Sequence, residues 1–296
     1  MVSLIINPTA GNGRSKKVAN AVIEQLSKKN IPFQALETED PGHATRLAQQ
    51  VAKQYEEGDF LLSIGGDGTF LEMLQGALGS GIPIASIPAG TGNDFLKSLQ
   101  VPSAPMDALE HILQAKPRMI DVGQLNEFVF ANECGAGFDV AVLDYAEKAK
   151  KYFHGLIPYL WGVIRTIFSY HPTPLKITAD GKTVFSGDCL VVSIANGQYI
   201  GGGIRISPTA DPQSGDLELI VVQDCPRTRM ICRYLPGLLG GKILGFKDTV
   251  VHCRASAITV QPLAEDASFR VNVDGEIRDL ADCAFSIQPA VLPVKM

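Results

Sequence analysis

The stretch that most constrains this chain is Gly65-Gly66-Asp67-Gly68-Thr69, which lies between a short apolar run and an amphipathic segment. The run Phe60-Leu61-Leu62 predicts a buried strand, and the leucines after the glycines recur at helical spacing. The glycines therefore lie in a strand-to-helix turn, where the backbone can approach a ligand closely and the first helical amides favour an anion. The carboxylate of Asp67 makes sense there if a divalent cation neutralises it together with a phosphate. An ordinary glycine-rich turn is the alternative.

Two other predicted strands end in glycine-rich turns. Residues 7–14 follow the apolar strand at 2–6, and residues 87–95 follow a strand at 83–86. The first turn lacks the register of a dinucleotide fingerprint and the Gly-Lys-Ser/Thr of a Walker loop. Asn7 and the backbone of residues 11–13 would form a phosphate-binding concavity; an exposed basic helix start is the alternative. Because parallel strands present their carboxyl ends at one edge, the three turns together outline a nucleotide phosphate site.

The order of predicted elements divides the chain into two domains. Up to residue 117, strands alternate with helices, which predicts a doubly wound parallel α/β sheet. From residue 118 to 285, strands follow one another, with hairpin signals at Asp180-Gly181 and Asp274-Gly275. This pattern predicts a mainly antiparallel β domain, interrupted by helical blocks at 141–169 and 227–244. The last strand, residues 286–296, is a candidate to rejoin the first domain.

Composition excludes some classes of protein. The chain has 296 residues, of which 46% are hydrophobic, and a net charge of -5 gives no overall attraction to nucleic acid or to an anionic membrane. Its six cysteines show no zinc-ligand spacing, which is typical of buried thiols in a reducing cytoplasm. The chain begins directly with an apolar strand, so we expect no signal peptide.

The apolar run at residues 153–165 is interrupted by Pro158, two glycines and Arg165. It is too short to span a bilayer. The run predicts a helix packed on the sheet; the alternative is that it lines an apolar substrate cleft or touches a membrane surface.

With these motifs in order, the sequence resembles the diacylglycerol kinase catalytic-domain family of bacterial lipid kinases, which includes sphingosine and ceramide kinases. The matching residues are Asn7-Pro8 with Gly11, Gly65 to Thr69, Pro88 with Gly90-Thr91 and Asn93-Asp94-Phe95, Gly137-Phe138-Asp139, and Val273 to Glu276. The Gly-Gly-Asp-Gly-Thr element alone also occurs in NAD kinases. The resemblance implies a nucleotide-binding α/β domain, a C-terminal β-sandwich lipid-binding domain and an active site in the cleft between them.

The resemblance also implies roles for individual residues. Glu276 would be the general base for a lipid hydroxyl, and Asp67 would be catalytic and, with Asp94, would hold Mg²⁺. The nucleotide would contact Asn7, Thr9, Gly11, Thr38, Gly66, Asp67, Gly68, Thr69, Thr91 and Asn93. The family's second, structural magnesium lies in a segment in which Ser214 here replaces the usual Asp. Oxygens for that second ion would come from Asp211, Asp216 and Glu218.

The predicted function is therefore an ATP- and Mg²⁺-dependent lipid kinase that phosphorylates diacylglycerol or a related lipid, with a role in phospholipid biosynthesis. We expect a cytoplasmic protein that meets its lipid at the inner face of the membrane, without a transmembrane segment and without a nucleic-acid partner, and a homodimer is compatible with the sequence. The alternatives are a NAD kinase-like enzyme acting on a soluble substrate and a nucleotide-binding regulatory protein with impaired catalysis. Ser214 favours the last of these, whereas Asp67 and Glu276 argue against it.

Overall fold

The computed structural model describes residues 1–149, 152–153, 157–264 and 269–296. The chain forms two compact units. The first contains Met1–Val122 and Pro289–Met296, and the second contains Gly123–Gln288. The unit boundaries therefore fall inside two long strands, β5 (Pro117–Leu125) and β17 (Cys283–Lys295).

The first unit is a parallel sheet with the strand order β17-β4-β3-β1-β2. Leu4 of β1 pairs with Ala35 of β2 on one side and with Leu62 of β3 on the other. The central strands β1 and β3 are mainly apolar and buried along their whole length because both faces of the sheet are covered. The strands are β1 (Val2–Ile6), β2 (Phe33–Glu37), β3 (Phe60–Gly65) and β4 (Ile84–Pro88).

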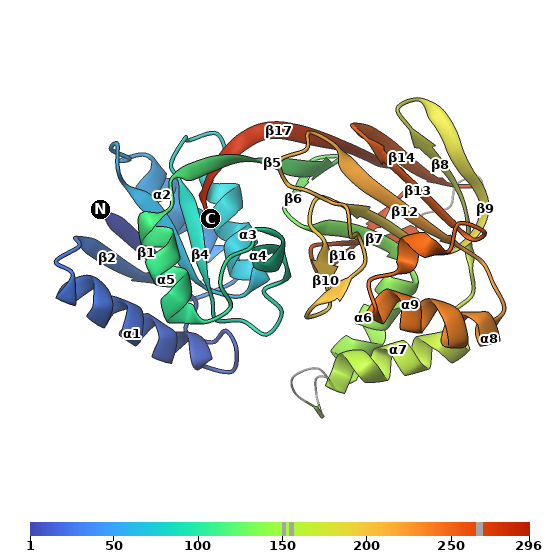
Figure 1. Ribbon diagram of the computed structural model, residues 1–296, viewed down its shortest axis with the longest axis horizontal. Coiled ribbons are helices and arrows are strands. Elements are labelled where there is room, and N and C mark those ends of the chain that lie inside the picture. The colour runs from blue at the N-terminus through green and yellow to red at the C-terminus, as the bar shows by residue number, and fades with distance from the viewer. Residues whose placement is uncertain (150–151, 154–156, 265–268) are drawn as a thin grey trace. The chain divides into compact units, whose positions relative to one another are not determined.

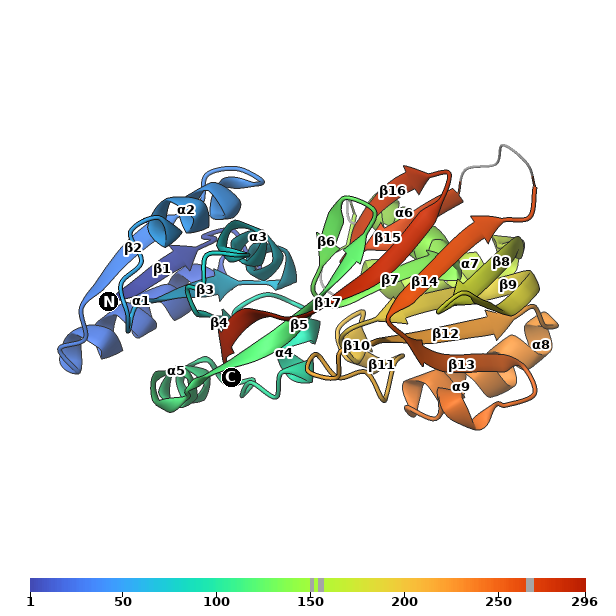
Figure 2. The same ribbon diagram turned by 90° about the horizontal axis from the view of Figure 1, so that it is seen from above.

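Helices cover both faces of this sheet (Figure 2). Alternate residues of β1 and β3 pack with α1 and α5 in one core, in which Leu4, Val22 and Leu109 are buried. Helices α2 and α3 pack against each other and contact β1 and β3. This arrangement is the predicted doubly wound α/β domain. The helices are α1 (Arg14–Lys28), α2 (His43–Ala52), α3 (Asp67–Ala77), α4 (Asp94–Ser98) and α5 (Pro105–Gln114).

The second unit is a β-sandwich-like domain whose main path is β16-β15-β7-β9-β8-β14-β17. Strand β12 pairs antiparallel with β9 and β13, and β8, β14, β7 and β15 are also antiparallel to their neighbours. The strands are β6 (Phe128–Phe130), β7 (Glu133–Gly137), β8 (Thr173–Ala179), β9 (Lys182–Ala195), β10 (Tyr199–Ile200), β11 (Ile204–Arg205), β12 (Leu217–Gln223), β13 (Val250–Ala255), β14 (Ala257–Pro262), β15 (Phe269–Val273) and β16 (Glu276–Leu280).

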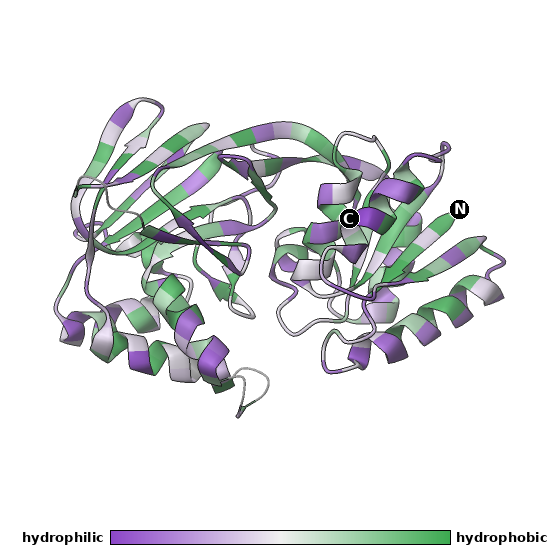
Figure 3. Cartoon of the chain, turned by 180° about the vertical axis from the view of Figure 1, so that it is seen from behind, coloured by the Kyte–Doolittle hydropathy of each residue, from purple (hydrophilic) through white to green (hydrophobic). Residues whose placement is uncertain are grey.

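The alternation of side chains on β12 divides this unit into two apolar clusters. Leu219 and Val221 enter the sandwich core, whereas Ile220 and Val222 pack with Tyr234 from the helical segment after β12. The helices of the unit lie along one side of its strands in two opposite views (Figures 1 and 3). They are α6 (Phe138–Ala149), α7 (Ile157–Ser169), α8 (Arg227–Arg229), a π-helical turn (Met230–Tyr234), α9 (Leu235–Leu239) and a 3₁₀ turn (Ile243–Gly245).

The predicted fold class is confirmed, with several local corrections. Strands β7, β10 and β11 were not expected, and β3 and β4 run two or more residues further than their apolar runs indicated. Both predicted hairpin turns are present: Asp180 and Asp274 have φ values of 45° and 47°, each followed by a left-handed glycine. Part of the predicted helix at 141–169 and of the apolar run at 153–165 lies outside the described residues.

Two further expectations can be compared with the structure. The six cysteines are free, but Cys232 is exposed and Cys225 and Cys253 are half-buried, so the expectation of buried thiols is confirmed only at the other three positions. Within the described residues, no helix has both the length and the apolar character needed to cross a bilayer.

Candidate nucleotide-binding site

The three glycine-rich turns of the first unit line one pocket of about 410 Å³. The β1–α1 turn contributes Asn7, Thr9 and Gly11, and the β3–α3 turn contributes Gly66, Gly68 and Thr69. Thr38 after β2 and Thr91 after β4 complete the set of predicted residues in the lining. The structure thus brings together eight residues that the sequence placed on four separate loops.

Direct contacts between glycines hold the turns together. Gly11 has a φ of 58°, and a Cβ there would lie 2.3 Å from the carbonyl oxygen of Ala89. A Cβ on Gly90 would lie 2.4 Å from the Cα of Gly66. Neither position has room for a side chain, so the close approach of the turns requires glycine.

The side chain of Asn7 organises the floor of the pocket. Its amide donates to Thr69 Oγ1 at 3.1 Å, and its carbonyl oxygen accepts from the Thr9 backbone N–H at 3.1 Å and from the Thr9 hydroxyl at 2.9 Å. The buried Ser15 hydroxyl donates to the Asn7 backbone oxygen. Asn7 therefore joins the first and second glycine turns through side-chain hydrogen bonds.

Two carboxylates lie beside this pocket without being in its lining. Asp67 begins α3 and Asp94 begins α4, and a Cβ on Gly92 would lie 2.9 Å from Asp67 Oδ2 and 3.3 Å from Asp94 Oδ2. Burial and the nearby negative charge of Asp94 raise the pKa of Asp67. Asp94 forms an ion pair with Lys97, at 2.8 Å.

This carboxylate pair fits a magnesium ion. The two Oδ2 atoms flank the same glycine, and carboxylate oxygens beside a phosphate site are the ligands that Mg²⁺ prefers. A divalent cation there would also relieve the repulsion that raises the pKa of Asp67.

The pocket lining itself carries acidic and no basic side chains among the described residues. Glu39, Asp40 and Glu72 line it. Glu72 accepts the backbone N–H groups of Gly42 and Ala44 at the start of α2, at 2.9 and 3.1 Å. Positive potential in the pocket must therefore come from the remaining free amides, the other helix starts and any bound cation.

Asn93 has a different position from the one predicted. Its side chain accepts from the Gly90 N–H at 3.1 Å and donates to the Gly90 carbonyl at 3.0 Å, and Asn93 does not line the pocket. With a φ of 51°, Asn93 closes the β4–α4 turn. Its support of nucleotide binding would act through the shape of this turn.

In the second unit, Asp274-Gly275-Glu276 forms the β15–β16 hairpin. The Asp274 carboxylate accepts three consecutive backbone N–H groups, those of residues 131–133, at 2.6 to 3.0 Å. Glu276, the first residue of β16, is exposed and pairs with Arg278 at 2.6 Å. Asp274 therefore fixes the hairpin, while the carboxylate of Glu276 stays accessible.

A buried acidic pair supports the same hairpin. Burial raises the pKa of Asp139 to about 6 and, together with the neighbouring Asp139, raises that of Glu133 well above its ordinary value. Asn272 donates to Asp139 at 3.4 Å and accepts from the Gly275 N–H at 2.7 Å. Asp139 is thus linked through one side chain to the turn that carries Glu276.

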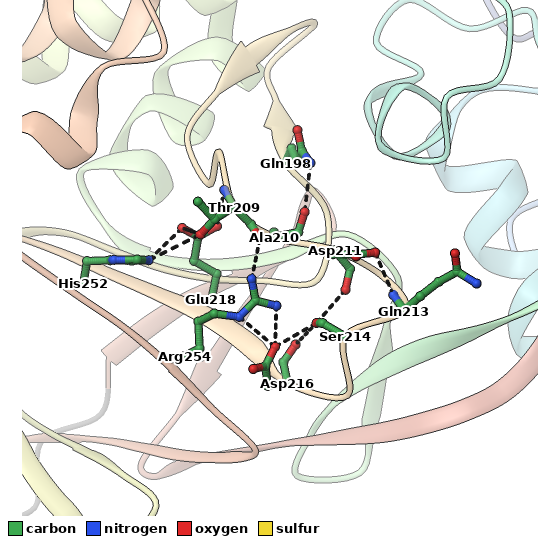
Figure 4. A network of polar contacts seen from close by, with 10 residues as sticks. All are labelled: Gln198, Thr209, Ala210, Asp211, Gln213, Ser214, Asp216, Glu218, His252 and Arg254. Atoms are coloured by element: carbon green, nitrogen blue, oxygen red, sulfur yellow. Dashed lines mark hydrogen bonds and ion pairs between the residues drawn. The ribbon is translucent and has the colours of Figure 1, made fainter.

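The segment predicted to hold a second metal forms a network of ion pairs and hydrogen bonds (Figure 4). Arg254 on β13 donates through Nε to Asp216 at 2.9 Å and through Nη1 to the Thr209 carbonyl. Glu218 is fully buried and accepts from the Thr209 hydroxyl at 2.6 Å, and His252 Nε2 lies 2.9 Å from it. The guanidinium of Arg254 holds the pKa of Asp216 below its usual range.

This segment does not fit a magnesium ion as it stands. Asp216 and Glu218 are already paired with Arg254 and His252, and Ser214 donates to Asp216 at 2.7 Å instead of offering a carboxylate. Asp211 is exposed, and one of its oxygens accepts from the Gln213 N–H at 3.0 Å. The protein supplies its own cation where the resemblance implied a metal.

Sequence reasoning missed Glu72, Arg254 and His252. Glu72 reaches the start of α2 from α3, and Arg254 reaches Asp216 from β13, 38 residues away. Neither contact is local. Arg254 lies opposite Glu218 because β12 pairs with β13, and no spacing in the sequence predicts that pairing.

Comparisons with known proteins cover both units. Residues 1–125 match the diacylglycerol kinase catalytic domain, and residues 132–296 match the YegS C-terminal NAD kinase beta sandwich-like domain. A diacylglycerol kinase of Mycobacterium tuberculosis is 29% identical over 300 residues, which cover 99% of this chain and 94% of that protein.

Two solved structures resemble the whole chain. One, from Bacillus anthracis and provisionally assigned as a diacylglycerol kinase, has a TM-score of 0.80 at 26% identity and covers 99% of this chain and 96% of its own. An NAD kinase from Archaeoglobus fulgidus, solved in complex with ATP, has a TM-score of 0.55 at 16% identity, with 100% and 94% covered. The second resemblance concerns the fold alone.

Proposed function

Because this chain belongs to the diacylglycerol kinase and YegS-like family of bacterial lipid kinases, we propose that it transfers the γ-phosphoryl group of ATP to the hydroxyl of diacylglycerol or a related lipid, with Mg²⁺ as cofactor. The observation that carries the proposal is the pocket formed by three interlocked glycine turns beside the Asp67–Asp94 pair. Such a pocket offers backbone amides to phosphate oxygens and carboxylates to a metal.

The acidic lining favours a metal-bound nucleotide over a free one. Phosphoryl transfer depends on positioning and on neutralisation of phosphate charge. With Glu39, Asp40 and Glu72 in the wall, a polyphosphate without its cation would face like charges. In this proposal Asp67 and Asp94 hold Mg²⁺, which when bound supplies the missing positive charge, and Asn7, Thr9 and Thr69 orient the phosphates.

Glu276 is assigned to accept the proton of the lipid hydroxyl. A carboxylate base must be accessible and fixed in position. Glu276 is exposed, and its hairpin is held by Asp274 and by Asn272. Arg278 lies beside it, with Nη2 2.6 Å from Oε2.

The assay for the acceptor presents labelled ATP with a panel of lipids in mixed micelles, and with NAD in parallel. We expect a labelled phospholipid on thin-layer chromatography, with diacylglycerol among the accepted substrates, and no labelling without Mg²⁺. Labelled NADP in place of a lipid product would favour the NAD kinase alternative. Binding of ATP without transfer to any acceptor would favour a regulatory protein.

The role of Glu276 is tested with Glu276→Gln, which keeps the size of the side chain and removes the basic oxygen. We expect kcat to fall by roughly 100- to 10,000-fold while ATP affinity, measured by calorimetry, changes little. Glu127→Gln, at another exposed position of the second unit, is the matched control. Lost ATP binding with unchanged turnover per bound nucleotide would assign Glu276 to the nucleotide instead.

A further inference from the structure

Helix α7 presents a stripe of large apolar side chains to solvent. Ile157, Trp161, Ile164 and Phe168 are 55%, 48%, 52% and 64% exposed. Their spacing of four, three and four residues places them on one face of the helix. We call these four residues the α7 stripe; single exposed apolar residues are ordinary, but a contiguous row marks an interaction surface.

The opposite face of α7 is already used for packing. Gly162 is buried, and a Cβ there would lie 2.5 Å from the Val142 carbonyl oxygen of α6. Thr166 and Ile167 are also buried. Packing against α6 therefore fixes the orientation of α7, and the α7 stripe remains exposed to solvent.

Charge indicates what covers the stripe. The only charged residue of α7 is Arg165, which is exposed and lies over the Tyr145 ring. The helical segment at residues 227–247, on the same side of the strands (Figure 1), contains five basic and no acidic residues. Together they hold six positive charges in a chain whose net charge is -5.

Most of these basic side chains have no ion-pair partner among the described residues. Asp248, just after the segment, pairs with Arg233. In the described part of the chain, no carboxylate forms an ion pair with the other four cations of the segment, which are exposed: Arg227, Arg229, Lys242 and Lys247. Ile231 and Leu239 of the same segment are 39% and 64% exposed. Basic side chains interleaved with exposed apolar ones are typical of helices that lie on anionic membranes.

We propose that the α7 stripe, together with the basic segment at residues 227–247 on the same side of the strands, docks this protein on an anionic lipid bilayer. Trp161 and its apolar neighbours would enter the headgroup and acyl boundary, while the arginines and lysines contact lipid phosphates. The surface has the composition that an interface requires, since tryptophan is favoured at that depth. This docking proposal rests on the proposed function, because a diacylglycerol substrate would reside in such a bilayer.

Trp161 is the only tryptophan of the chain, so it reports directly on this surface. The full chain, without ATP or diacylglycerol, is titrated with vesicles of phosphatidylcholine and phosphatidylglycerol, and with phosphatidylcholine alone. We expect a blue shift of its fluorescence with the anionic vesicles, and quenching by lipids brominated on the acyl chain. Protein that floats with the vesicles while Trp161 emission stays unshifted and unquenched would overturn the proposal.

Charge substitutions test the two components separately. Ile164→Asp with Phe168→Asp should lower vesicle partitioning more than tenfold, because two apolar side chains leave the interface. Arg227→Gln with Arg229→Gln should lower it about tenfold or more on anionic vesicles only. Leu263→Asp, at an apolar residue just after β14 that is 47% exposed, is the matched control and should leave partitioning unchanged.

Kinase assays distinguish a failure of docking from a failure of the proposed function. The Ile164→Asp and Phe168→Asp variant should phosphorylate a short-chain, monomeric diacylglycerol normally and lose activity on diacylglycerol in vesicles. Equal activity on both forms would contradict docking through this surface and leave the kinase intact. A wild-type chain that binds vesicles but phosphorylates neither would contradict the proposed function alone. A dimer that the stripe variant dissociates, with vesicle binding unchanged, would assign the surface to a second copy and overturn the proposal.

Discussion

Two groups of carboxylates in this protein are neutralised in different ways. Asp67 and Asp94 lie beside the pocket of the glycine-rich turns, and Asp94 forms an ion pair with Lys97. Asp216 and Glu218, in the second unit, are paired with Arg254 and His252. The pKa of Asp67 is raised by burial and by Asp94, whereas the pKa of Asp216 is lowered by Arg254. The first group has two carboxylates beside one lysine and could offer oxygens to a metal ion, whereas the second group has its own cation, Arg254.

The largest expected effect is on kinase activity and comes from removing the carboxylate of Asp67. Asp67→Ala should lower kinase activity by at least 1,000-fold, because a metal ligand at the transferring phosphate contributes several kcal/mol to the transition state. Circular dichroism should show an intact fold. Asp107→Asn, at an exposed position on α5, is the control and should retain normal activity. Near-normal turnover of Asp67→Ala would contradict its metal role.

The second effect is on stability and concerns the built-in cation. Arg254→Met should reduce the free energy of unfolding in urea by about 2 kcal/mol, since it leaves Asp216 and the Thr209 carbonyl without their charged donor. Lys28→Met removes an exposed pair with Glu24 and should leave the free energy of unfolding almost unchanged. Equal losses in the two variants would mean that Arg254 forms an ordinary surface pair.

The third experiment converts one kind of site into the other. In an Asp67→Asn background, Mg²⁺ should leave the Tm of the otherwise wild-type chain unchanged. Adding Ser214→Asp and Arg254→Met exchanges the guanidinium for a further carboxylate, and we expect millimolar Mg²⁺ then to raise the Tm by about 2–4 °C. A Mg²⁺-dependent rise without these two substitutions would show that the native segment binds metal despite Arg254.

The smallest effects are opposite dependences of stability on pH. The folded-state pKa of Asp67 is raised, so its ionisation opposes folding above that pKa, and Asp67→Asn should be more stable than wild type at pH 7. The gain should disappear as the pH falls towards the unfolded pKa.

Asp216 has a lowered pKa, so its stabilisation is present above the unfolded value and is lost as the pH falls through the folded one. Asp216→Asn should therefore be less stable at pH 7, with the difference vanishing in acid. Urea titrations at pH 7 measure both differences, and titrations repeated below the lowered folded-state pKa of Asp216 test their disappearance. The same sign for both variants at pH 7 would contradict the comparison.

The parts of the fold that could be predicted from sequence are those set by local pattern. The apolar run at β1, the alternation in β12 and the Asp-Gly hairpins carry their structure within a few neighbouring residues. Strand β7 contains Gly135 and Gly137 and is short, so its residues gave no strand signal; pairing with β9 and β15 makes it a strand.

The same distinction applies to the candidate site. Glycine turns at the ends of parallel strands predicted a shared pocket because sheet geometry brings strand ends together. The contacts of Glu72 with α2 and of Arg254 with Asp216 depend on which elements pack side by side. The spacing of residues in the sequence does not predict which elements pack together. The α7 stripe shows a third case, since its apolar residues were evident but only the structure shows which face of the helix α6 covers.

The course of β17 has a consequence for how the protein is made. Val294 pairs in parallel with Ile84 of β4, so residues 289–296 complete the sheet of the first unit. A ribosome releases these residues only after the entire second unit, and until then β4 keeps an unpaired edge. Exposed strand edges invite pairing with other chains, and chains that fold during synthesis form their early parts first. During synthesis, the sheet of the first unit would therefore keep one edge unpaired until residues 289–296 have been made.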